Sequence, residues 1–142
     1  MRFPDINVWL ALAFQSHSNH LAALKWFESI EREKVVFCRQ TQQGFIRLAT
    51  NAKAFGNESV TMKVAWKLYE AIIADSRIAL HPEPSDIEET WKAFTLQNAR
   101  SPKLWNDAWL AAFAVVESLE LVSFDKGFKQ FKGLKCRILA SS

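Results

Sequence analysis

The sequence predicts an α/β protein of three layers (α/β/α), in which helices cover both faces of a mostly parallel central sheet. Short apolar runs typical of strands alternate along the chain with amphipathic helical patterns, and this alternation is typical of parallel strands joined by helical crossovers. The chain has 142 residues, of which 49% are apolar. A chain of this length forms about one domain and buries roughly two-thirds of its unfolded surface. We therefore expect a single domain over residues 1–142.

The first half of the chain predicts two strands and four helices. In chain order these are a short strand at Phe3, helices over 7–15 and 19–33, a strand over 34–38, and helices over 41–51 and 59–75. The second helix is the clearest, because Leu24, Phe27 and other apolar residues recur at helical spacing. Thr41 is a candidate N-cap for the third helix, and Ser59 for the fourth.

The second half predicts two helices and three strands. In chain order these are a strand over 77–81, helices over 84–99 and 103–119, and strands over 119–124 and 136–139. Ser85 with Glu88 three residues later has the pattern of a capping box, so we expect the first of these helices to begin there. The helix over 103–119 is the longest and most apolar.

Two aspartates stand where predicted strands end. Asp5 follows the first strand, and Asp125 follows the run "LELVSF". Because the carboxyl ends of parallel strands meet at one edge of a sheet, both acids are expected at that edge. Asp107 lies in the first turns of the apolar helix "KLWNDAWLAAFA", where an unpaired buried carboxylate is costly. An Asp at any one of these places also serves as an ordinary cap or turn residue.

Carboxylates brought together repel one another, and a divalent cation reverses that penalty. Hard oxygen ligands select Mg²⁺ or Mn²⁺. Such an ion polarises a phosphate and lowers the pKa of a water molecule. The acids Asp5, Asp107 and Asp125 therefore predict a metal-dependent phosphodiesterase site, with these three side chains as both metal ligands and catalytic residues.

Composition and charge exclude several classes of protein. No apolar run reaches the roughly 20 residues that span a bilayer, and no secretory signal opens the chain. Cys38 and Cys136 are far apart, without metal-ligand spacing. We expect a soluble, cytoplasmic protein with no membrane partner. The net charge of +3 and the pI of about 9.0 suggest a polyanionic partner only weakly.

The tryptophans have two expected roles. Trp26, Trp66 and Trp91 lie at apolar positions of predicted helices, so we expect them in the core. Trp9 and Trp105 flank the acids, where core packing and stacking on nucleic-acid bases are both open.

With these residues in hand, the chain resembles the PIN-domain family and, within it, the VapC-type toxins of bacterial toxin–antitoxin pairs. The resemblance is carried by five segments in order: "PDINVWLAL", "HSNHLAALKWFES", "RQTQQGFIRLATN", "NDAWLAAFA" and "LVSFDKGFKQF". Each motif is short, whereas their order and spacing together are fairly specific. The resemblance implies a PIN-like fold, dependence on Mg²⁺ or Mn²⁺, and endoribonuclease activity by a metal-activated water, with Asp5, Asp107 and Asp125 as the ligands.

The chain departs from the family at one position. Many relatives place a Glu on the short helix near "TQQGF", where this chain has Gln42 and Gln43. Gln42 is the better match. An amide is a poorer metal ligand than a carboxylate, so one ion or two is left open, and so is an ordinary role for Gln42 on the helix surface.

Five further residues have a functional and an ordinary interpretation. Asn7 is expected to support Asp5 or to cap a helix, and Ser123 to hold Asp125 or to be a simple strand-end hydroxyl. Arg47, Lys126 and Lys129 are expected to hold the RNA backbone, or to be solvated surface cations.

The expected partners are RNA, of which tRNA and rRNA are suggested by the resemblance, a cognate antitoxin protein, and a second copy of the chain in a homodimer. Two other classes remain open. One is a catalytically weak PIN-like module that binds RNA without cleaving it. The other is a response-regulator domain, which the position of Lys126 directly after Asp125 fits poorly.

Overall fold

Five strands form one sheet at the centre of the molecule. The computed structural model describes residues 1–142. The strands are β1 (Arg2–Pro4), β2 (Val35–Phe37), β3 (Ile78–Leu80), β4 (Glu120–Ser123) and β5 (Lys135–Ile138). They pair in the order β3-β2-β1-β4-β5, and every pairing is parallel. The predicted fold class is confirmed, and β1 lies in the middle of the sheet.

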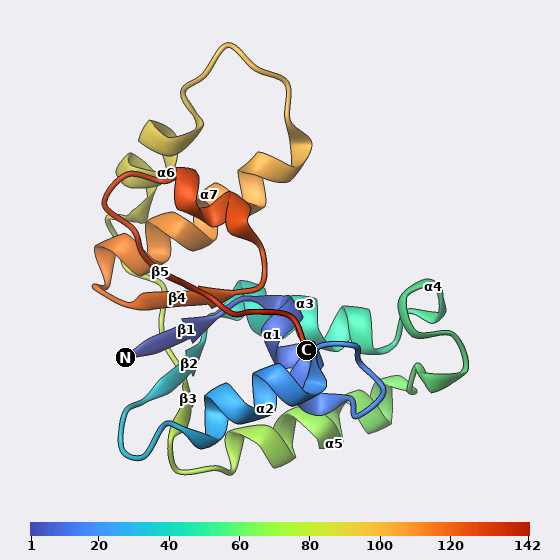
Figure 1. Ribbon diagram of the computed structural model, residues 1–142. Coiled ribbons are helices and arrows are strands. Elements are labelled where there is room, and N and C mark those ends of the chain that lie inside the picture. The colour runs from blue at the N-terminus through green and yellow to red at the C-terminus, as the bar shows by residue number, and fades with distance from the viewer.

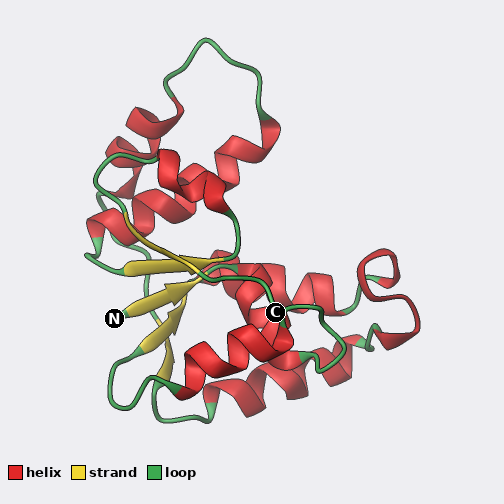
Figure 2. Cartoon of the chain, viewed as in Figure 1, coloured by secondary structure: helices red, strands yellow, loops and turns green.

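Helices cover both faces of the sheet, so the molecule has three layers (Figure 1; Figure 2). One face carries α1 (Ile6–Ala13), α2 (His20–Glu28), α3 (Arg39–Ala49) and α5 (Met62–Ile73), and the other carries α6 (Ile87–Thr95), α7 (Pro102–Val116) and the 3₁₀ helix η2 (Lys126–Gln130). The short α4 (Ala52–Phe55) and η1 (Gly56–Glu58) lie between α3 and α5. None of these helices has the length and apolar character needed to cross a bilayer.

The alternation of side chains along the strands divides the core in two. Phe3 and Leu121 point toward α6 and α7, whereas Val35, Phe37 and Val122 point toward α1, α3 and α5. All five side chains are buried. Successive strand residues face opposite sides of a sheet, so strands only three or four residues long hold both helical layers.

The caps of three helices differ from the sequence prediction. Cys38, not Thr41, is the N-cap of α3, and Thr41 instead completes the capping box from the third helical position. The reason is that β2 already ends at Phe37, which leaves no room for a loop before the helix.

Similar shifts affect α5 and α6. Ser59 was the expected cap of α5, but η1 occupies the residues before it and Thr61 caps the helix through Val64 N. Ser85 lies in a turn, and α6 begins after Asp86, whose side chain makes no capping hydrogen bond.

One prediction about the tryptophans is wrong. Trp66 projects from α5 and is 50% exposed, so it is not a core residue. Trp26 is buried, and Trp91 is partly buried against the core under α6 and α7. Trp9 belongs to the core, where it stacks on Phe37 with ring centroids 3.8 Å apart.

Gly44 allows α3 to approach α1 next to the end of β1. A Cβ at this position would lie 2.2 Å from Ile6 Cδ1 and 3.0 Å from Ile6 Cγ1. The first distance is shorter than any van der Waals contact, so a side chain here must displace Ile6. Because Ile6 directly follows Asp5, this packing also fixes the start of α1.

We expect Gly44→Ala to destabilise the protein although Ala favours helix. Overpacking costs about 1–3 kcal/mol, which exceeds the helix-propensity gain of about 0.5–1 kcal/mol. In an Ile6→Val background, which removes the Cδ1 atom but leaves Cγ1 3.0 Å from the new Cβ, the same substitution should cost clearly less stability. Urea unfolding of the four proteins measures this coupling. An equal loss of stability in both backgrounds would show that Ile6 is not the constraint.

Candidate active site

Asp5 lies at the junction of three elements. It follows the last residue of β1 and caps α1, with its Oδ1 accepting a hydrogen bond from Val8 N at 3.1 Å. Its Oδ2 accepts a hydrogen bond from Ser123 Oγ, at the end of β4. The side chain is buried, with only 5% of the residue exposed. Asp5 therefore has two roles at once, as a helix cap and as a buried carboxylate.

Ser123 connects Asp5 to Asp125. Its hydroxyl donates to Asp5 Oδ2 and accepts from Asp125 N at 2.9 Å. Asp125 is the N-cap of η2, with its Oδ1 accepting from Gly127 N at 2.7 Å. Both acids therefore lie at the carboxyl edge of neighbouring strands, linked by one hydroxyl.

Asp107 reaches the same edge from α7. This helix leads into the amino end of β4, so its first turns lie at the opposite, carboxyl edge. Lys103 lies one turn before Asp107, and its ammonium group reaches the two less buried acids, Asp107 and Asp125, called the outer acids below. Lys103 Nζ lies 2.7 Å from Asp125 Oδ2 and 3.6 Å from Asp107 Oδ2. Lys103 was not among the residues predicted from the sequence for this site, although its i,i+4 spacing from Asp107 was a usable signal.

The pKa values of the three acids are shifted differently. Burial raises the pKa of Asp5 from 3.8 to about 6, and repulsion by Asp107 and Asp125 acts in the same direction, against the hydrogen bonds from Ser123 and Val8. Burial also raises the pKa of Asp107, whereas the hydrogen bond from Lys103 lowers the pKa of Asp125. Because Asp107 and Asp125 both raise the pKa of Asp5, the three carboxylates interact electrostatically.

The acids do not by themselves form a closed metal cage. No group of three or more His, Cys, Asp or Glu side chains converges closely enough to hold a metal ion. An ammonium group instead bridges two of the acids. The donor set is nevertheless one of hard carboxylate oxygens with mutual repulsion, a composition that suits Mg²⁺ or Mn²⁺.

The supporting residues are placed unequally. Ser123 contacts two of the acids, as described. Asn7 is exposed in the first turn of α1, and no hydrogen bond joins it to Asp5. Gln42 is buried in α3, where its Oε1 accepts from Arg39 Nη1 at 2.5 Å rather than from a group of the acid cluster. Gln43 is exposed.

The expected RNA-binding cations are exposed and make no ion pair. Lys126 and Lys129 lie on η2, immediately after Asp125. Arg47 lies eight residues after the start of α3, about 12 Å farther along its axis. Arg39, at the N-terminal end of α3, is nearer to the carboxyl edge and was missed because the sequence prediction started the helix at Thr41.

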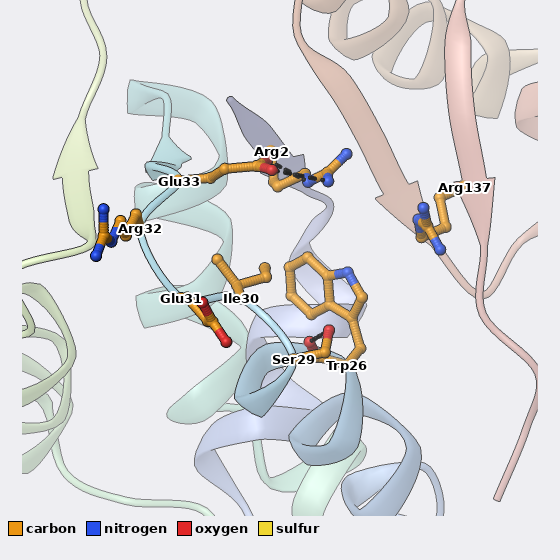
Figure 3. A pocket seen from close by; sticks show the side chains of 8 residues that line it. All are labelled: Arg2, Trp26, Ser29, Ile30, Glu31, Arg32, Glu33 and Arg137. Carbon is orange, nitrogen blue, oxygen red and sulfur yellow. Dashed lines mark hydrogen bonds and ion pairs between the residues drawn. The ribbon is translucent and has the colours of Figure 1, made fainter.

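A hollow in the surface lies away from the acids. It measures about 360 Å³ and is lined by Arg2, Trp26, Arg137 and residues 29–33, as Figure 3 shows. Arg2 begins β1, so its backbone lies at the amino edge, and it pairs with Glu33 and Glu120. Arg137 also pairs with Glu120, so three of the five charged residues that line this hollow already take part in ion pairs.

The parallel five-stranded sheet between two layers of helices is a PIN-like α/β fold. The sequence model of the PIN domain family matches residues 2–134, and the chain belongs to this family.

The chain is also 43% identical over 145 residues to Ribonuclease VapC41 of Mycobacterium tuberculosis (strain ATCC 25618 / H37Rv), with 99% of each chain covered. Two solved structures share the fold. VapBC2 from Rickettsia felis, bound to a DNA fragment from its promoter, has a TM-score of 0.70 at 10% identity, with 98% of each chain covered. Mycobacterium tuberculosis VapC20, described as a sarcin-ricin-loop-cleaving toxin, has a TM-score of 0.68 at 16% identity, with 95% of this chain and 99% of that chain covered.

The buried carboxylate predicts a pH-dependent stability. The folded-state pKa of Asp5 is about 6, above its ordinary 3.8. The folded protein therefore binds more protons than the unfolded chain between about pH 4 and pH 6, and stability falls as the pH rises through this window. Asp5→Asn should remove this loss and raise the free energy of unfolding above pH 6 by about 1–3 kcal/mol, because Asn also caps helices.

Urea unfolding of both proteins in a chelating buffer at pH 4 and pH 7.5 measures the effect. The exposed Asp86→Asn is the matched control, with no expected change. Equal stabilities of wild type and Asp5→Asn at pH 7.5 would contradict the cost assigned to the buried charge.

Proposed function

We propose that this chain is a metal-dependent endoribonuclease and the toxin of a toxin–antitoxin pair. The observation that carries the proposal is the hydrogen-bonded chain Asp125–Ser123–Asp5, with Asp107 close enough to raise the pKa of Asp5. The likeness to Ribonuclease VapC41 over nearly the whole chain supports RNA as the substrate. Because VapC20 cleaves the sarcin-ricin loop, ribosomal RNA is one class of substrate to test, beside tRNA.

Asp5, Asp107 and Asp125 are the residues that would hold Mg²⁺ or Mn²⁺. When bound, the ion would polarise the phosphodiester and lower the pKa of a water molecule. Ser123 keeps the Asp5 carboxylate oriented and fixes the backbone of Asp125. Lys103 supplies a positive charge beside the two outer acids, where a phosphate group of the substrate would come close.

The exposed cations provide contacts for the RNA backbone. Lys126 and Lys129 follow Asp125 directly, and Arg39 lies at the N-terminal end of α3. Arg47 extends this set along α3. Phosphate contacts of this kind hold RNA without reading its sequence, and they weaken as salt concentration rises.

The proposal includes a cognate antitoxin as protein partner. Leu21 is 70% exposed, and it borders a hollow of about 590 Å³ that Trp26 and Leu139 also line. The apolar side chains at this hollow offer a place where the antitoxin would pack. A homodimer stays a prediction, which light scattering of the purified chain would check.

Cleavage of RNA by the purified chain tests the function. With Mg²⁺ or Mn²⁺ present, the wild type should cut rRNA or tRNA, and a chelator should abolish the activity. Asp5→Asn, Asp107→Asn and Asp125→Asn should each lose about 100-fold or more in rate, as removal of one electrostatic catalytic group does in other enzymes. Asp86→Asn should keep the wild-type rate.

Cleavage that survives the chelator or Asp5→Asn would exclude the metal-dependent mechanism. RNA binding by the wild type without any cleavage would favour the alternative, a PIN-like module that binds RNA without cleaving it. The specific reason for this alternative is Gln42, an amide bonded to Arg39 where many relatives have an acid.

A second prediction concerns competition between Lys103 and the ion. Lys103→Met removes a unit charge that lies about 3–4 Å from two of the proposed ligands. Such a charge is worth roughly 1 kcal/mol at 4 Å in water, so Mn²⁺ binding should strengthen about fivefold. Lys126→Met, an exposed cation without an ion pair, is the control. Calorimetric titration with Mn²⁺ decides, and equal affinity of the two variants would mean that Lys103 does not oppose the ion.

A further inference from the structure

A hollow lined by tryptophans adjoins the acid cluster. It measures about 370 Å³ and lies between the N-terminal end of α3 and the helices α6 and α7. Its apolar walls are Trp91, Trp105 and Trp109, and its polar lining includes Gln40, Gln43 and Asn106. We call it the tryptophan hollow. Apart from Arg39, none of its lining residues has a role in the proposed mechanism.

The hollow and the acid cluster meet at the first turns of α7. Asn106 precedes Asp107 in α7, and Asn106 Oδ1 accepts a hydrogen bond from Gln40 Nε2 at 2.7 Å. This bond ties α3 to α7 beside the site. Asp107 faces Lys103 and Asp125, whereas Trp105 and Trp109 face the hollow. The hollow and the acid cluster thus lie on different faces of the same turns of α7, so an RNA strand that reaches the acids could place a nearby base in the hollow.

The tryptophans present a fixed and accessible aromatic surface. Trp105 is 55% exposed, although it is among the largest apolar side chains. Trp91 packs against Trp105. Its Nε1 donates a hydrogen bond to the Trp105 carbonyl at 3.0 Å, and the two rings meet edge to face with centroids 5.9 Å apart. Trp109 stacks on Phe113 at 5.6 Å. The aromatic wall thus needs little ordering when a flat ligand binds.

The polar lining suits a base rather than a phosphate. Arg39 and Glu83 contribute one charge of each sign, so the hollow has no excess positive charge. Gln43 is exposed, and Gln40 Oε1 is buried with no donor in the protein. An aromatic surface edged by amide groups matches a nucleobase, whose faces stack and whose edges carry hydrogen-bond donors and acceptors.

We propose that the tryptophan hollow binds one unpaired base of the RNA, next to the cleaved phosphodiester, by stacking on Trp105. The inference rests on the proposed ribonuclease function and adds a base-binding subsite to it. A base can enter only when it has left a duplex, so the substrate is single-stranded or looped RNA at this nucleotide.

The test measures binding apart from cleavage. Wild-type protein in a chelating buffer is titrated with a short unstructured RNA, and with the same RNA in which every base is absent but the backbone is kept. Fluorescence anisotropy gives the affinity. Trp105→Ala should weaken binding of the complete RNA roughly 5- to 150-fold, which is the range for loss of one stacked base, and should leave binding of the abasic RNA unchanged.

Three variants separate stacking from structure. Trp66→Ala is the matched control, because Trp66 is similarly exposed at 50% but lies on α5, on the other face of the sheet. It should bind both RNAs as the wild type does. Trp105→Phe should keep part of the affinity, whereas Trp105→Leu should lose as much as Trp105→Ala. Thermal melting of each variant checks that the fold is intact.

Each result is decisive. If Trp105→Ala binds like Trp66→Ala while the wild type binds and cuts RNA, the ribonuclease function stands and the base site is refuted. Equal affinities of the Phe and Leu variants refute stacking, as does an equal loss with the abasic RNA. If Trp105→Ala weakens only the binding of an antitoxin, the hollow is a protein site. A wild type that neither binds nor cuts RNA overturns the function itself, and the base site with it.

Discussion

The site depends on one carboxylate that the fold keeps buried. Asp5 directly follows β1, the central strand of the sheet. It caps α1 and accepts a hydrogen bond from Ser123 at the end of β4. Its two hydrogen bonds only partly offset the cost of burial, since its pKa is still raised to about 6. A carboxylate that served only as a helix cap would be more stable exposed to water than buried. The burial of Asp5 therefore lowers the stability of the folded protein, and helix capping alone does not account for it.

The balance of charge at the carboxyl edge follows from that cost. Asp107 and Asp125 increase the repulsion on Asp5, and Lys103 reduces the repulsion between them. The hydrogen bond to Asp125 raises the pKa of Lys103, so its ammonium group stays protonated. An ammonium ion on a flexible stem that is 71% exposed can move aside. The acids are thus stabilised without being committed to a permanent partner.

Much of this arrangement follows from sequence pattern, and the remainder follows from contacts between distant segments. Alternating strand and helix patterns predicted the parallel sheet, and parallel strands bring Asp5 and Asp125 to one edge whatever the details of the loops. The helix caps were predicted less well, because Cys38 caps α3 only as a result of the abrupt end of β2. The ion pair of Lys103 with Asp125 was not predictable, because it joins residues 22 apart in the sequence, whereas the pairs Lys103–Asp107 and Arg39–Gln42 have the spacing of neighbours on one helix.

The acids and the tryptophan hollow differ in what they can recognise. In the proposed function, the carboxylates, a divalent cation and the exposed lysines would act on the phosphodiester backbone, which is the same at every nucleotide, so they would not choose where RNA is cut. A surface that accepts a base can distinguish an unpaired nucleotide from a paired one. Both surfaces are built on consecutive residues of α7, with Trp105 and Asn106 on the hollow and Asp107 on the acid cluster. One rigid helix would therefore fix the distance between the site that selects a nucleotide and the site that cleaves beside it.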